Sequence, residues 1–165
     1  MTLQRILVVF LTLWLSGCSD DAEETLVEKQ IELATGGKAD VDISKGQMTI
    51  TSDSKGGEVS MSIGENVTLP EDFPKDVLVY PGSKLESAVQ MPEGFSLGLT
   101  SKDNRKNIVD AYQDTMQSNG WKVQTTMVID TQSIMMYEKD NRVTSILVDD
   151  GNKDSVRISV TIVRK

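Results

Sequence analysis

The 165-residue sequence has no histidine and a single cysteine, Cys18. Without histidine the chain cannot build a His-based catalytic triad, and without histidine or a second cysteine it cannot build the usual nitrogen and sulfur zinc sites. The lone cysteine also has no disulfide partner within the chain. Carboxylates, hydroxyls and methionine thioethers are therefore the groups from which a catalytic or metal site would be built.

Positive charge is also scarce, because 17 lysines and arginines face 25 acidic residues and give a formal net charge of −8. Contacts to phosphate need clustered lysine and arginine, so we expect no nucleic-acid partner. Anionic lipid headgroups would repel so acidic a chain. Any membrane affinity must therefore come from another source.

No apolar run is long enough to form a transmembrane helix. The run at residues 6–15 has about half of the roughly 20 apolar residues that such a helix needs. Arg5 precedes it, and the small residues Ser16 and Gly17 follow it, which is the pattern of a secretory signal peptide. Residues 1–17 are predicted to be that signal peptide, and residues 18–23 an acidic tether.

The four residues Leu15-Ser16-Gly17-Cys18 resemble the lipobox of bacterial lipoprotein precursors. The resemblance implies cleavage between Gly17 and Cys18, a diacylglycerol on the cysteine sulfur and acylation of the new amine. Two or three acyl chains anchor a protein stably, because each buried CH₂ contributes about 0.8 kcal/mol. Lipid on Cys18 would then hold the chain in the cell envelope and leave no free thiol.

The residue after the cysteine bears on which membrane is used. In lipoproteins similar to this one, an aspartate there commonly retains the protein on the inner membrane. This chain has Ser19 there, which favours the periplasmic face of the outer membrane over the inner membrane.

Residues 24–66 are expected to form a small unit, a helix followed by a three-stranded meander. Apolar residues at helical spacing mark residues 24–35, and Gly36-Gly37 follows as a cap. Three segments near 41–43, 48–50 and 59–63 alternate apolar and polar residues, with glycine turns between them. Residues 67–82 hold three of the four prolines and predict an extended connector with apolar plugs at Phe73, Val77, Val79 and Tyr80.

Residues 83–165 predict a larger domain. Two alternating segments precede a helix over about 103–118, and four more strands follow it, giving the order ββαββββ. In the last strand Val156, Ile158, Val160 and Ile162 should face the core. The predicted fold class is α+β: a largely antiparallel sheet with one packed helix, preceded by the helix-plus-meander unit.

A second resemblance covers most of the mature chain. The connector 69–77, Tyr112 on a helix and the pair Gly120-Trp121 look like those of small bacterial lipoproteins of unassigned function. The shared motifs are structural, and no catalytic residues come with them.

Three motifs suggest chemistry, and each is better explained structurally. Ser52–Lys55 matches S-x-x-K, but the companion elements of that enzyme class are missing. Asp149–Asp154 is rich in carboxylates, yet the twelfth position of a calcium loop would be Val160. The seven methionines after Cys18 could bind Cu(I), but most fall in the apolar register of a strand or helix. We therefore expect no cofactor and no metal.

The sequence 134–137 is apolar on both faces of its predicted strand. We therefore take Ile134, Met135, Met136 and Tyr137 as a candidate partner surface. The expected function is a non-enzymatic binding or adaptor module that recognises an envelope protein or a wall component. A carrier of a small apolar ligand is the alternative, and a carboxylate-based hydrolase comes third.

Overall fold

A computed structural model describes residues 39–44, 46–54, 57–151 and 154–165 of the chain. The predicted signal peptide, the tether with Cys18 and the helix over 24–35 lie outside the described residues. Within the described part, no helix is long and apolar enough to cross a membrane.

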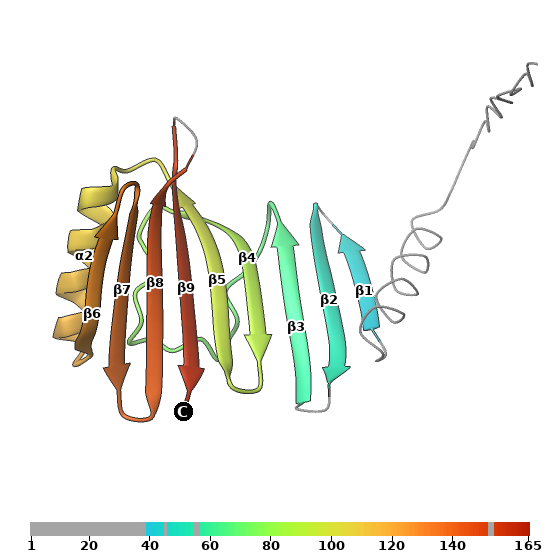
Figure 1. Cartoon of the computed structure of the whole chain (residues 1–165). Helices are drawn as coiled ribbons and strands as arrows, with labels where there is room; N and C mark the ends of the chain where they lie inside the picture. Colours follow the sequence, from blue (N-terminus) through green and yellow to red (C-terminus); the bar gives the residue numbers. More distant parts are fainter. Residues whose placement is uncertain (1–38, 45, 55–56, 152–153) are drawn as a thin grey trace, which may run out of the picture.

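Nine antiparallel strands form one sheet in the order β1-β2-β3-β4-β5-β9-β8-β7-β6 (Figure 1). The strands are β1 (Ala39–Ser44), β2 (Gln47–Ser54), β3 (Gly57–Gly64), β4 (Lys84–Met91), β5 (Gly94–Ser101), β6 (Lys122–Ile129), β7 (Gln132–Lys139), β8 (Arg142–Asp150) and β9 (Val156–Arg164). In this sheet, neighbouring strands are consecutive in sequence except at one place, where β5 pairs with β9.

The helix α2 (Arg105–Ser118) lies against one face of the sheet at its β6 end and runs roughly along the strands (Figure 1). Asn104 caps its start by accepting a hydrogen bond from the backbone N–H of Asn107. Ile108, Tyr112 and Met116 recur every four residues and are completely buried against the sheet.

The connector between β3 and β4 runs along the same face as α2. It is a succession of turns, in which Phe73 donates to the carbonyl of Pro70 and Val77 to that of Pro74. The prediction of an extended connector is therefore wrong in its conformation. Its apolar plugs are confirmed, since Phe73, Val77 and Tyr80 are buried in the core and Val79 packs against it.

The face that α2 and the connector cover is called the core face below. Directly paired residues of antiparallel strands point to the same side, so Leu97, Val160, Ile146 and Met135 form one row across β5, β9, β8 and β7. All four are at most 1% exposed. The predicted alternation in β9 is confirmed, because Val156, Ile158, Val160 and Ile162 are buried.

The apolar side of the sheet changes at β4. The pairing of Ile50 with Met61 and of Met61 with Val89 places these side chains on the face opposite the core face. The core face of β2 and β3 is polar instead, and the hydroxyls of Thr49 and Ser62 lie 3.2 Å apart on it. The covered core therefore ends at β4, although the sheet continues.

The α+β prediction, with a helix-plus-meander unit set before a ββαββββ domain, is wrong. The meander strands belong to the same sheet as β4–β9, because Ser60–Ile63 pair with Ser87–Gln90. The described chain is dominated by strands and has a single helix. Alternation indicates where a strand lies but not what it pairs with, and β4 would expose an unpaired edge without β3.

Candidate functional site

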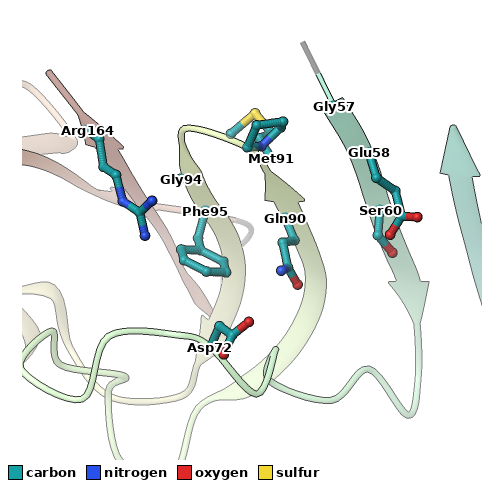
Figure 2. Close-up of a pocket in the computed structure, with 10 residues that line it drawn as sticks. Gly57, Glu58, Ser60, Asp72, Gln90, Met91, Gly94, Phe95 and Arg164 are labelled. Atoms are coloured by element: carbon teal, nitrogen blue, oxygen red, sulfur yellow. The ribbon is translucent and has the colours of Figure 1, made fainter. Parts of the chain in front are cut away.

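A hollow of about 660 Å³ lies on the core face where β3 and β4 separate (Figure 2). The two strands pair only from Ser60 to Ile63 on β3, so the beginning of β3 diverges from the end of β4. Gly57 closes one end, where a Cβ would lie 2.8 Å from Pro92 Cγ. The backbone of Gly57 has φ +125°, which L side chains rarely adopt.

Side chains from separate parts of the chain line this hollow. Figure 2 shows Glu58 and Ser60 on β3, Gln90 on β4, Arg164 at the end of β9 and Asp72 on the connector. They offer two carboxylates, a guanidinium, an amide and a hydroxyl around one opening.

The floor of the hollow is the ring of Phe95, which is 8% exposed. Phe73 meets this ring edge-on at 5.7 Å between centroids, which fixes its orientation. An apolar floor with polar walls suits a ligand that has one apolar patch and many hydrogen-bonding groups.

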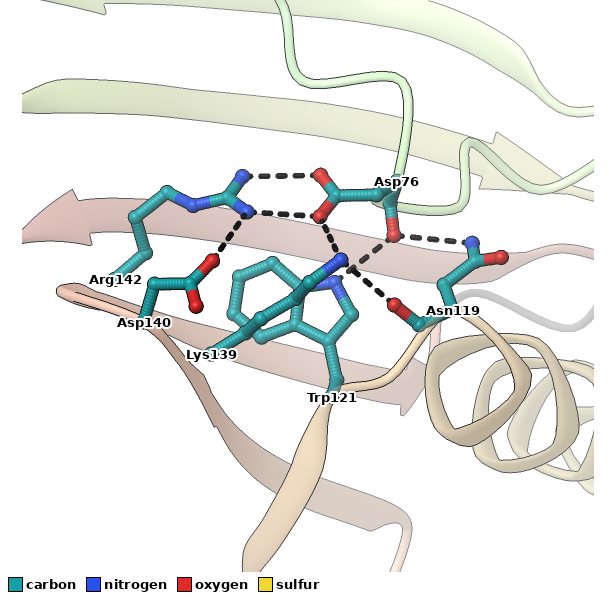
Figure 3. Close-up of polar contacts among 6 residues, drawn as sticks. All are labelled: Asp76, Asn119, Trp121, Lys139, Asp140 and Arg142. Carbon is teal, nitrogen blue, oxygen red and sulfur yellow. Dashed lines mark hydrogen bonds and ion pairs between the residues drawn. The ribbon is translucent and has the colours of Figure 1, made fainter.

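A polar cluster fastens the connector next to the C-terminal end of α2 (Figure 3). The carboxylate of Asp76 accepts two hydrogen bonds from Arg142, at 3.0 and 2.8 Å, and one from Lys139 at 2.7 Å. Its backbone carbonyl accepts from the indole N–H of Trp121 at 2.9 Å and the side-chain amide of Asn119 at 3.1 Å. The Arg142 guanidinium also lies 4.9 Å from the centre of the Trp121 ring.

This cluster changes the titration of Asp76. Hydrogen bonds from Arg142, helped by Lys139 and opposed by partial burial, hold the pKa of Asp76 well below its usual range. The same contact raises the pKa of Arg142. Asp76 therefore stays ionised and both cations stay paired with it.

A second contact fastens the connector at the other end of α2. The Tyr80 hydroxyl donates to Asp103 Oδ2 at 2.7 Å, which lowers the pKa of Asp103. The Tyr80 ring also stacks on Tyr112, with 6.4 Å between centroids. Asp72 and Phe73 lie shortly before Asp76 in the chain, so anchoring of the connector at Asp76 and Tyr80 holds these two residues beside the hollow.

The structure divides the candidate partner surface between two faces. Met135 and Tyr137 are completely buried on the core face and cannot contact a partner. Met136 is 37% exposed on the opposite face, and Ile134 is half-buried beside it. Only these two remain available, because consecutive residues of a strand point to opposite sides.

The other motifs do not assemble a site in the described residues. Ser52 lies in β2 next to its turn, and Lys55 lies outside the described residues. Asp149 is held by Arg157 and Thr131, which lowers its pKa. In the described part, no three acidic or thiol groups converge as a metal site would require.

The sequence did not indicate Asp72, Asp76, Gln90 or Arg164 as site residues. Asp76 lies more than sixty residues from Lys139 and Arg142, so no local spacing could link them. The one available signal was the placement of Asp72 and Asp76 beside the buried plugs of a proline-rich connector.

The comparisons with known proteins give one similarity. A family model described as START domain-like matches residues 83–162, slightly less than half of the chain. The matched segment holds β4, β5, α2, β6–β8 and most of β9, and the match favours a ligand-binding fold for this segment. Comparison with curated proteins and with solved structures found no match.

Proposed function

We propose that this protein is a lipid-anchored envelope lipoprotein whose folded part is a non-enzymatic binding module, with the hollow of Figure 2 as its ligand site. The observation that carries the proposal is the convergence of β3, β4, β9 and the connector on one polar opening. Its volume of about 660 Å³ lies within the range of roughly 300–1,000 Å³ of small-ligand sites.

The chemistry of the lining favours a wall component as the ligand. Asp72 and Glu58 suit an ammonium group, Arg164 suits a carboxylate, and Gln90 and Ser60 suit amides and hydroxyls. A peptide-bearing amino sugar from the cell wall carries all of these groups. Its less polar ring face would lie against Phe95.

Lipid on Cys18 supplies the membrane affinity in this proposal, since the acidic chain would be repelled by anionic headgroups. Confinement beside the membrane raises the effective concentration of the module for a wall close to it. With Ser19 after the cysteine, the proposed location is the periplasmic face of the outer membrane.

The anchor is tested by labelling cells with a palmitate analogue. The unaltered chain should incorporate the label and sediment with membranes, and the Cys18→Ala chain should do neither. Label on Cys18→Ala, or none on the unaltered chain, would contradict the anchoring proposal.

The ligand site is tested by binding full-length protein to solubilised wall fragments. Gln90→Ala should weaken binding roughly 2- to 10-fold, because it removes a neutral hydrogen-bonding group that contributes about 0.5–1.5 kcal/mol, and Arg164→Ala should weaken it by roughly tenfold or more, because a hydrogen bond between charged groups contributes about 1.5–3 kcal/mol. Gln117→Ala, an exposed change on α2, is the matched control and should bind normally. Binding that neither variant weakens would remove the hollow from the proposal.

The second candidate is a carrier of a small apolar ligand, which the START-like match favours. In the described structure, the space between α2 and the sheet is occupied by buried side chains that include Tyr112, Met116, Met135 and Tyr137. A ligand there would have to displace α2. Native mass spectrometry of protein purified from cells tests this candidate. A carrier should show the mass of the chain plus a bound ligand, and extraction with organic solvent should remove the extra mass.

A further inference from the structure

The strand β6 forms an edge of the sheet and is unusually exposed. It pairs with β7 alone, and all eight of its residues are exposed. Its apolar side chains Val123, Met127, Val128 and Ile129 are 44%, 46%, 65% and 50% exposed. An edge strand of this kind offers unpaired backbone groups to another strand.

Beyond its first residues, this edge lacks the features that usually prevent strand pairing. Between Val123 and Ile129 there is no proline and no charged side chain. A bulge lies near its beginning, between Val123 and Thr125, and the strand is regular from Thr125 onward. Eight residues is also a long edge, because strands are typically five or six residues in length.

Opposite charges stand at the two ends of β6. Lys122 begins the strand and Asp130 directly follows it, both are exposed, and neither forms an ion pair with another described residue. A strand with one sign of charge at each end is complementary to a second copy of itself in the antiparallel direction.

We propose that β6 pairs antiparallel with β6 of a second copy of this chain, about a two-fold axis through Thr126. In this register Thr125 lies opposite Met127, and, once the bulge between Val123 and Thr125 is counted, Lys122 of each copy lies opposite Ile129 and next to Asp130 of the other. Thr125 and Met127 both point to the face opposite the core face, and Val123 and Val128, which the bulge brings opposite each other, both point to the core face, so each of these pairs stays on one face. In the dimer the unpaired backbone N–H and C=O groups of β6 form hydrogen bonds, and part of the exposed apolar surface is covered.

The interface uses neither the hollow nor Cys18, so it is independent of the proposed function. The two core faces lie on the same side of the joined sheet, because a two-fold axis perpendicular to a sheet preserves its faces. The two hollows therefore open on one side of the dimer.

Cysteine crosslinking of the full-length chain tests the axis. Directly opposite residues in an antiparallel pair have Cα atoms about 4.5–5.5 Å apart, which a disulfide can span. Thr126→Cys should therefore form a disulfide-linked homodimer in intact cells treated with a mild oxidant. The unaltered chain is the background control for Cys18.

Thr125→Cys is the matched control, because Thr125 is also exposed and lies on the same strand. In the proposed register the two Thr125 positions are offset by two residues, which places their Cα atoms about 8 Å apart, beyond disulfide reach. A Thr126→Cys chain that crosslinks no better than Thr125→Cys, or that crosslinks to a different protein, overturns the proposal.

Charge exchange tests the register with the purified, detergent-solubilised protein. Lys122→Glu should weaken dimerisation about tenfold in analytical ultracentrifugation, since two exposed ion pairs become two repulsions. Lys122→Glu combined with Asp130→Lys restores attraction and should recover the dimer. Recovery supports the register, whereas a monomeric unaltered chain or a double variant as weak as the single one overturns it.

Discussion

Replacing Asp76 with asparagine tests the anchoring of the connector. The change keeps the shape of the side chain and the backbone carbonyl that Trp121 and Asn119 contact. It removes the charge that Arg142 and Lys139 share. Among the described residues, Lys139, 27% exposed, is then left without a carboxylate partner, and Arg142, 20% exposed, keeps only the exposed Asp140 at 4.0 Å.

The magnitude follows from these contacts. A hydrogen bond to a charged group contributes about 1.5–3 kcal/mol, and asparagine can keep at most part of three such bonds. Because the Asp76 side chain is 25% exposed, water compensates some of the loss. We expect the free energy of unfolding to fall by about 2–3 kcal/mol, and the melting temperature by roughly 5–10 °C.

Urea unfolding followed by far-ultraviolet circular dichroism measures this loss. Asp140→Asn is the matched control, because Asp140 is 75% exposed and 4.0 Å from Arg142, and asparagine tolerates its positive φ of 54°. The control should change the free energy of unfolding by less than about 0.5 kcal/mol. Equal effects from the two variants would refute the anchoring role of Asp76.

The pH dependence gives a second measure of the same contact. Arg142 and Lys139 lower the pKa of Asp76 in the folded state, so the unfolded state binds its proton more readily. The stabilisation is complete above the unfolded pKa of about 4 and is lost as the pH falls further. The unaltered chain should therefore lose stability below about pH 5 more steeply than Asp76→Asn, and identical slopes would contradict this account.

Three further outcomes are expected. Thr144→Val should leave the free energy of unfolding unchanged or raise it by up to about 1 kcal/mol in urea titration, because the Thr144 hydroxyl is buried without a partner in the described structure. Met135→Asp should abolish cooperative thermal unfolding, whereas Met136→Asp should retain it, since the first side chain is buried and the second exposed; the reverse would contradict the face assignment. Trp121→Phe should lower the free energy of unfolding by about 1–2 kcal/mol through the lost hydrogen bond to Asp76, and a neutral result would show that this bond contributes nothing.

The local elements of the described chain were readable from the sequence. Period-two alternation located strands such as β9, whose Val156, Ile158, Val160 and Ile162 are buried as predicted. The buried residues of α2 likewise follow the helical spacing of Ile108, Tyr112 and Met116. Alternation and helical spacing involve only a few neighbouring residues, so they can be recognised from the sequence alone.

The candidate partner surface, residues 134–137, shows what local patterns cannot predict. The run Ile134–Tyr137 is apolar on both sides, and the sequence does not say which side faces the core. The register with Ile146 places Met135 beneath α2, and its neighbour Met136 faces away. A buried position is decided by what covers it, and Met135 is covered by α2, a separate element that precedes β6 and β7 in the chain.

The sequence alone determined the acidic character of the chain, the absence of histidine chemistry, the lipobox resemblance at Cys18 and the positions of most described strands. Only the tertiary structure showed that β3 pairs with β4 and that Asp72 and Arg164 line one hollow. It also showed that the apolar side chains of β2 and β3 lie on the face opposite the core face. The physical reason is that strand pairing and ion pairs depend on distance in space. The contacts of Asp76 with Lys139 and Arg142 cross more than sixty residues of sequence, and no local pattern records them.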